Sequence, residues 1–357
     1  MDGLEVLKPG LLTTVQDLGR IGYQKYGVPS SGAMDQTALR VANLLVGNAE
    51  GAAGIEATGE GPALRALADS VVAIVGADME PLIDGRPVEW GVPTVLRSGQ
   101  VLELGPARRG LRTYLAVAGG IDVPLMLESR STCLPAAFGG FHGRALRNRD
   151  LLAVGAAGRS LPIKGRRLPQ GWIGPLGETL AVRVTLGPQD DRFTPEGIHT
   201  FLTETYRLTP EIDRMGMRLQ GPPIHHGSGA DIISDSIPLG TIQVPADGQP
   251  IILLADRQTT GGYAKIAVVL REDVDRLAQA TPGQVVRFRQ VSLEDAHASL
   301  MRHEAKFQAL QQAWQREGTH APYILRLKGR SYRAGVEGGE GMYRITVEEQ
   351  AEGKPDG

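Results

Sequence analysis

Short apolar runs separated by glycine and proline turns recur along the whole chain. Each run is only a few residues long and rich in Val, Ile and Leu, which is typical of a strand and too short for a helix. The clearest runs are 71–75, 92–96, 101–104, 113–117, 182–186, 251–254, 264–270 and 285–288. The pattern therefore predicts a mainly β protein.

Helical spacing occurs in four places. We expect short helices over 34–46, with Ser31 as a possible cap, over 195–206 after the capping residue Thr194, and over 272–279. The longest predicted helix covers 293–316 and is capped by Ser292. Its apolar stripe consists of Leu293, Ala296, Leu300, His303, Phe307, Leu310 and Trp314. This stripe fits packing on its own chain, and it also fits docking on a partner.

The length and the composition limit the classes of protein. A chain of 357 residues is expected to form about two domains. We place one region at 1–165, a second at 178–291, the amphipathic helix at 292–317, and hairpin strands with a polar tail at 318–357. One cysteine, Cys133, and the lack of a leader or apolar span indicate a cytoplasmic protein. A net charge of −2 with mixed signs favours neither nucleic acid nor membrane binding.

Four glycine-rich loops combine arginine with carboxylates or hydroxyls. They lie at 16–20, 129–132, 213–216 and 256–265. A guanidinium group grips carboxylates and phosphates with two parallel hydrogen bonds, and glycine lets backbone amides approach the same anion. The loops therefore indicate an anionic ligand, although a neighbouring Asp-Arg pair can also be a simple loop brace.

Other recognised chemistry is missing from the sequence. It contains no phosphate loop of the Walker type, no dinucleotide fingerprint and no nucleophile elbow. His225 and His226 are adjacent, so their side chains would diverge on a strand, and we expect no metal site.

Several segments, in order, resemble the family of the 5-oxoprolinase C subunit, which is also called allophanate hydrolase subunit 2 or KipA-like, and which includes the biotin-dependent carboxyltransferase subdomain of urea carboxylase. The segments are Thr13-Thr-Val-Gln-Asp-Leu-Gly-Arg20, Gly27-Val-Pro-Ser-Ser-Gly-Ala-Met-Asp35, Ala118-Gly-Gly-Ile-Asp122, Ser129-Arg-Ser-Thr132, Asp213-Arg-Met-Gly216, Ala230-Asp-Ile-Ile-Ser-Asp235, Ile242-Gln-Val-Pro245 and Ala255-Asp-Arg-Gln-Thr-Thr-Gly-Gly-Tyr263.

The resemblance implies tandem cyclophilin-like β-barrels. It also implies a KipI-like B subunit and an A subunit, with which the chain would use ATP to open 5-oxo-L-proline to L-glutamate. Two alternatives stay open: a carboxyltransferase acting on urea or a related amide, and a non-catalytic KipA-like antagonist of a kinase inhibitor. No Ala-Met-Lys-Met motif follows the last strands, so we expect no biotin attachment site on this chain.

The loops and the resemblance together give two sets of candidate site residues. The predicted catalytic set, which would bind the small anionic amide and orient the reacting groups, is Asp17, Arg20, Asp35, Arg130, Arg214, Asp256 and Arg257. The predicted substrate-binding set is Gln16, Ser131, Thr132, Gln243, Gln258, Thr259, Thr260, Gly261, Gly262, Tyr263 and Lys265.

Overall fold

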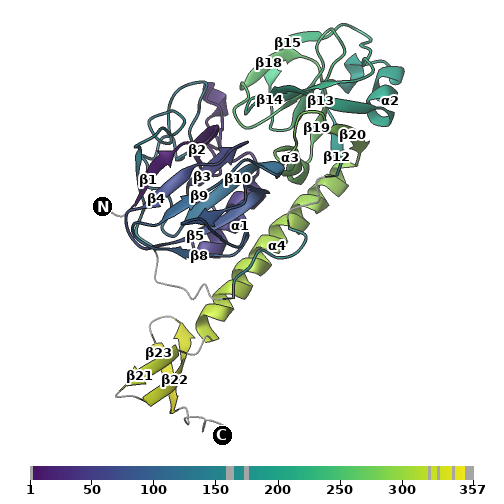
Figure 1. Cartoon of the computed structure of the whole chain (residues 1–357). Helices are drawn as coiled ribbons and strands as arrows, with labels where there is room; N and C mark the ends of the chain where they lie inside the picture. The colour runs from purple at the N-terminus through teal and green to yellow at the C-terminus, as the bar shows by residue number, and fades with distance from the viewer. Residues whose placement is uncertain are drawn as a thin grey trace.

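The computed structural model describes residues 3–157, 165–172, 177–320, 323–327, 330–339 and 342–349. It contains two β regions in tandem and a long helix that runs past both to a small three-stranded sheet (Figure 1). The mainly β fold class and the long C-terminal helix are therefore confirmed. The predicted region boundaries fall partly in undescribed residues, as do most of the expected linker and the tail after 349, and they stay predictions.

The first region consists of two antiparallel sheets with a core between them. One sheet has the order β11 (Leu151–Ala153), β1 (Gly3–Lys8), β4 (Ala63–Ala66), β9 (Val101–Glu103), β6 (Leu82–Ile83) and β7 (Arg86–Pro87). The other has the order β2 (Leu12–Gln16), β3 (Gly54–Thr58), β10 (Arg109–Val117), β5 (Ser70–Asp78) and β8 (Thr94–Leu96). Alternate side chains of both sheets, such as Leu64, Leu102 and Leu115, fill the space between them.

The second region contains a closed barrel. Its strands follow the order β12 (Thr179–Leu186), β19 (Lys265–Val269), β16 (Thr241–Gln243), β17 (Ile251–Leu253), β14 (Gly216–Gln220), β13 (Thr205–Ile212) and β20 (Val285–Gln290). A separate ribbon pairs β15 (Asp231–Ser236) with β18 (Thr260–Tyr263). The predicted C-terminal strands are β21 (Tyr323–Leu327), β22 (Arg330–Gly339) and β23 (Met342–Glu349).

The four predicted helices are present, with small differences at their ends. They are α1 (Gln36–Val46), α2 (Pro195–Thr203), α3 (Arg271–Leu277) and α4 (Leu293–His320). Thr194 and Ser292 cap α2 and α4 as expected, because their hydroxyls accept from Gly197 N and Asp295 N at 3.0 Å each. Ser31 as the cap of α1 is wrong: Asp35, extended and directly before the helix, accepts from Ala38 N at 2.9 Å.

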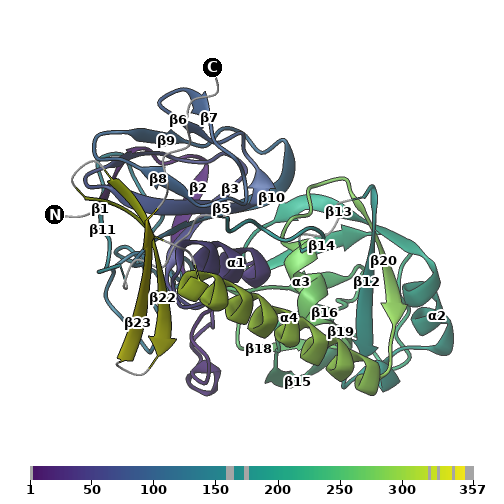
Figure 2. The ribbon, with the colours of Figure 1, turned by 90° about the horizontal axis from the view of Figure 1, so that it is seen from below.

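Helix α4 crosses both regions and passes α1 and α3 on its way (Figure 2). The second half of its apolar stripe, Phe307, Leu310 and Trp314, is buried in a cluster with α1 and the five-stranded sheet. The first half is not, since Leu293 is 73% exposed and Leu300 is 37% exposed. Packing on its own chain is thus confirmed only for the second half.

Candidate functional site

Two loops of the first region touch backbone to backbone at Gly19 and Gly32. Both glycines have positive φ angles, of 93° and 90°. A Cβ atom on Gly19 would lie 2.7 Å from the carbonyl oxygen of Ser30, so only glycine permits this approach. The contact places Arg20 beside the segment 30–32, and its backbone N donates to Ser30 O at 2.7 Å.

Asp17 organises the loop that carries Arg20. Its carboxylate accepts hydrogen bonds from Gly19 N at 2.8 Å, Ser129 Oγ at 2.7 Å and Arg130 N at 2.6 Å, and also from Ser131 Oγ. All these donors are neutral. The carboxylate is therefore fully engaged without forming a hydrogen bond to the Arg20 guanidinium group.

The Arg20 side chain is completely buried, yet within the described structure its guanidinium group hydrogen-bonds only to carbonyl oxygens. Its Nε donates to Met126 O at 3.2 Å and its Nη2 to Ser131 O, while its Cζ lies 4.5 Å from the centre of the Phe138 ring. Its Nη1 has no hydrogen-bond partner among the described residues. Burial lowers the pKa of Arg20, against the opposing charge of Asp17.

Arg214 lies at the junction of the two regions and is neutralised there. Its Nε and Nη2 bind the two carboxylate oxygens of Asp256 at 2.9 and 3.2 Å, and its Nη1 binds Glu56. Its Nη2 also donates to Gly32 O at 2.7 Å. Although burial opposes it, the charges of Glu56 and Asp256 raise the pKa of Arg214. This geometry is that of a brace between regions.

Glu56 is the member of this network that the sequence analysis missed. It lies on β3, is 1% exposed, and also accepts from Met34 N at 2.9 Å and from the Tyr114 hydroxyl at 2.8 Å. The available signal was a single carboxylate inside an otherwise uncharged strand. A buried charge of that kind needs a partner, which Arg214 of the second region provides.

Arg257 directly follows Asp256 in the chain but does not pair with it. Its Nε donates to Ile237 O at 2.9 Å, and its Nη1 donates to Leu254 O at 3.1 Å and to Ser30 Oγ at 3.4 Å. Burial, helped by the like charge of Arg271, lowers the pKa of Arg257 to about 10. Arg257 is thus a second buried guanidinium whose hydrogen-bond partners, among the residues described, are all neutral.

Three of the four predicted arginines contact segment 30–32, Arg20 through its backbone N and Arg214 and Arg257 through their side chains. Arg20 comes from the first region, and Arg214 and Arg257 come from the second. Arg130 does not join them: its Nε donates to Val123 O at 3.0 Å, and its Nη2 lies 3.4 Å from Asp122, at the exposed edge of the same loop. Loops from both regions therefore contact one segment, while the roles predicted for these arginines stay predictions.

The loop after Asp256 lines a neighbouring cavity of about 560 Å³. Gln258 and Tyr263 lie in its wall together with Gln243 and Asp213. Gln243 Nε2 donates to Tyr263 O at 3.3 Å, which fixes the far end of the loop. The segment 256–263 therefore joins two environments: Asp256 and Arg257 are buried at the junction, and Gln258 and Tyr263 face the cavity.

The remaining predicted binding residues hold the loops in place. Thr260, Gly261 and Gly262 belong to β18, and Thr259 O accepts from Ile237 N at 3.0 Å. The buried Lys265 pairs with Asp235 at 2.7 Å.

Two further predicted residues brace the first region. Gln16 Nε2 donates to Thr132 O at 3.1 Å, and Thr132 Oγ1 donates to Val15 O at 3.0 Å. These contacts fasten the loop 129–132 to β2, next to Arg20.

Asp35 lies apart from the arginines, at the start of α1. Its Oδ2 accepts from Gln279 Nε2 of the second region at 2.8 Å. Burial and the neighbouring carboxylate of Asp275 raise the pKa of Asp35 to about 7, against the effect of the Gln279 hydrogen bond.

Metal coordination and membrane crossing find no support in the described residues. No group of three or more His, Cys, Asp or Glu in the described part of the chain is arranged to hold a metal ion. Among the described helices, none is both long and apolar enough to cross a membrane.

Comparisons with known proteins agree with the fold and the resemblance. The carboxyltransferase domain family, subdomain A and B, matches residues 26–290. The C subunit of the Escherichia coli 5-oxoprolinase is 37% identical over 313 residues, which are 87% of this chain and 98% of that protein.

Two solved structures of other proteins also superpose on most of this chain. The Kluyveromyces lactis urea carboxylase superposes with a TM-score of 0.82 at 28% identity, over 93% of this chain and 32% of that one. The structure of TTHA0988 has a TM-score of 0.73 at 37% identity, over 81% of this chain and 55% of that one. This chain thus spans about half of TTHA0988 and a third of the urea carboxylase. It belongs to the carboxyltransferase family, subdomains A and B, that includes the C subunit of 5-oxoprolinase.

Proposed function

We propose that this chain is the C subunit of an ATP-dependent 5-oxoprolinase, which opens 5-oxo-L-proline to L-glutamate together with a KipI-like B subunit and an A subunit. The observation that carries the proposal is the match over 98% of the C subunit of the Escherichia coli 5-oxoprolinase. The urea carboxylase match covers only 32% of that chain. The near end-to-end match favours the oxoprolinase.

Arg20 and Arg257 are the groups that we assign to the substrate. 5-Oxoproline carries one carboxylate, and a buried guanidinium that lacks an anionic partner gains most from receiving one. Both side chains meet this condition within the described structure, whereas Arg214 is already neutralised by Glu56 and Asp256. The role of Arg214 in this proposal is to hold Asp256, and with it the Arg257 loop, against the first region.

ATP would supply the phosphoryl group that activates the lactam. The Arg20 Nη1, buried without a hydrogen-bond partner among the described residues, is the donor that we assign to an anionic oxygen, of a carboxylate or of a phosphate. This chain's own contribution is to bind the anion in a site from which water is excluded, where a guanidinium group interacts more strongly than in water.

The test is turnover in the assembled system. The chain, with its B and A subunits, is given 5-oxo-L-proline and ATP, and L-glutamate is measured. We expect Arg257→Met and Arg20→Met each to lower the rate by about 100-fold or more, by the loss of one charged contact. Arg86→Met, at an exposed position on β7, is the control and should leave turnover unchanged. No glutamate from the three wild-type subunits would overturn the proposal.

A carboxyltransferase acting on a urea-type amide is the second candidate. It is favoured by the TM-score of 0.82 to the urea carboxylase over 93% of this chain. Such an activity needs biotin on a separate carrier. Carboxylation of urea that depends on an added biotinylated carrier, in the absence of oxoprolinase turnover, would select it.

A further inference from the structure

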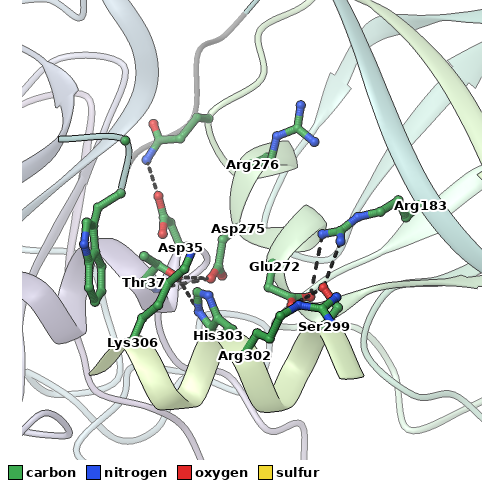
Figure 3. A pocket seen from close by; sticks show the side chains of 13 residues that line it. Asp35, Thr37, Arg183, Glu272, Asp275, Arg276, Ser299, Arg302, His303 and Lys306 are labelled. Carbon is green, nitrogen blue, oxygen red and sulfur yellow. Dashed lines mark hydrogen bonds and ion pairs between the residues drawn. The ribbon is translucent and has the colours of Figure 1, made fainter. Parts of the chain in front are cut away.

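A cavity of about 380 Å³ lies between α1, α3 and α4, and it shares no lining residue with the 560 Å³ cavity (Figure 3). It opens where the two regions and the long helix meet. Four basic side chains line it, namely Arg183, Arg276, Arg302 and Lys306, and three acidic ones, namely Asp35, Glu272 and Asp275. The wall thus carries both positive and negative charges, and a ligand of this cavity must complement both.

One part of the wall offers buried carboxylate oxygens. Glu272 Oε1 accepts from Ser299 Oγ at 2.9 Å, but Glu272 Oε2 has no hydrogen-bond partner among the described residues and lies 3.9 Å from Arg183 Nη2. Asp275 is better satisfied, because its Oδ2 accepts from Thr37 Oγ1 at 2.6 Å. Glu272 Oε2 is thus a buried acceptor that is ion-paired with Arg183 but has no hydrogen bond within the described structure, and an ammonium group of a ligand would supply the missing donor once the side chain turns into the cavity.

The helix α4 supplies the opposite charge. Arg302 and Lys306 lie one turn apart on the helix and line the same cavity. Neither forms an ion pair within the part of the chain that the structure describes, whereas Arg183 and Arg276 are both held by Asp273. The cations on α4 are thus available for the acidic groups of a ligand.

We infer that this cavity binds an acidic α-amino acid, with its ammonium group at Glu272 and its carboxylates at Arg302 and Lys306. A polyanion would meet three carboxylates in the wall and a polycation would meet four bases, so only a ligand with both signs satisfies both parts. The volume lies at the small end of the range of ligand pockets, which is about 300–1,000 Å³. It suits a small metabolite with ordered water.

Binding should also move a proton at Asp35, which lies in the wall of the same cavity. The charged groups that face it are Asp275 and Arg271 of α3 and, across the cavity, His303 and Lys306 of α4. Burial and the carboxylate of Asp275 raise the pKa of Asp35 to about 7. At pH 7, Asp35 is therefore protonated in a fraction of the molecules. The ligand carboxylate at Lys306 lies nearer to Asp35 than the ammonium group at Glu272 does, and a neighbouring negative charge disfavours the Asp35 carboxylate, so binding at pH 7 should take up a fraction of a proton.

The experiment is calorimetric titration of the full chain with L-glutamate; this choice of probe rests on the proposed function, because L-glutamate would be its product. Glutarate, which has both carboxylates but no ammonium group, is the matched ligand. We expect L-glutamate to bind at least tenfold more tightly than glutarate. The observed heat at pH 7 should depend on the ionisation enthalpy of the buffer, as proton uptake requires.

Variants of three residues that line the cavity, here called the mouth variants, then locate the site. The double variant Arg302→Gln with Lys306→Gln, and separately Glu272→Gln, should each weaken L-glutamate binding at least tenfold, while Arg86→Gln should leave it unchanged. No heat with L-glutamate, equal affinity for glutarate, or unchanged affinity in the mouth variants would each overturn the inference. Loss of binding in Arg257→Met with retention in the mouth variants would overturn it too, by placing the ligand at the arginines. The titration needs neither ATP nor other subunits, so its outcome is independent of whether the assembled system hydrolyses 5-oxoproline.

Discussion

Each of the two regions presents an aspartate and an arginine close together in one loop. In each loop the two side chains bind different partners and do not bind each other. In the first region Asp17 is occupied by backbone and hydroxyl donors, and Arg20 bonds to carbonyl oxygens. In the second, Asp256 is occupied by Arg214, and Arg257 bonds to carbonyl and hydroxyl oxygens. When an aspartate and an arginine are close in the sequence, the aspartate can therefore hold the loop in place while the arginine stays without an anionic partner and can bind an anion.

The difference between the regions lies in what neutralises the aspartate. Asp17 uses neutral donors from its own region, so its cluster is local. Asp256 uses a buried cation that also binds Glu56 of the other region, so this cluster joins the two halves of the molecule. We expect the second cluster to be far more sensitive to the loss of a charge, since removing one ion leaves others buried and unpaired.

The largest expected effect is that of Arg214→Met. The substitution leaves Glu56 and Asp256 buried without their cation, which costs about 3–5 kcal/mol of unfolding free energy. The matched control is Arg218→Met, four residues away, whose ion pair with Glu211 has side chains that are 53% and 73% exposed. That variant should lose less than about 1 kcal/mol. Urea denaturation measures both, and equal losses would show that the junction is not held by this ion network.

The fold was largely predictable because its signals are local. Strand runs such as 71–75 and 182–186 are set by alternation over a few residues, and the caps Thr194 and Ser292 lie directly before the helices they start. The exposure of Leu293 and Leu300 was not predictable in this way. It depends on where α4 leaves the barrel, and no periodicity within the helix encodes that.

The candidate site was predictable in its loops but not in its pairings. Glycine and arginine mark the loops at 16–20 and 256–265 in the sequence, and both lie at the junction of the regions. The partner of Arg214, however, includes Glu56, which is 158 residues away along the chain. Pairing over that separation depends on how the two regions pack. The sequence therefore could not show that Arg214 is neutralised by carboxylates whereas Arg20 and Arg257 are not.

Asp17→Asn tests the local cluster and should have an intermediate effect. The amide retains one acceptor oxygen where the carboxylate offered two, so when that oxygen serves the donors of Gly19, Ser129 and Ser131, the NH₂ group faces the Arg130 N–H that Oδ2 accepted. We expect a loss of about 2 kcal/mol of unfolding free energy. Asp122→Asn, at an exposed carboxylate of the same region, is the control and should change stability by less than about 0.5 kcal/mol. A smaller loss for Asp17→Asn than for the control would mean that the loop does not depend on this carboxylate.

The smallest effect concerns the charge of Arg257 itself. Because its pKa is lowered to about 10, the guanidinium group is cationic below pH 9 and mostly neutral at pH 11. Anion affinity that depends on this charge should therefore fall about tenfold between pH 9 and pH 11, equivalent to about 1.4 kcal/mol. The measurement is binding of 5-oxo-L-proline to the assembled subunits across this range, with circular dichroism to establish that the chain stays folded. Arg257→Met should bind more weakly at pH 9 and show a smaller decline, because the Arg257 charge is then absent over the whole range. A parallel decline in the variant would place the titrating group elsewhere, and Arg257 would then be a brace like Arg214.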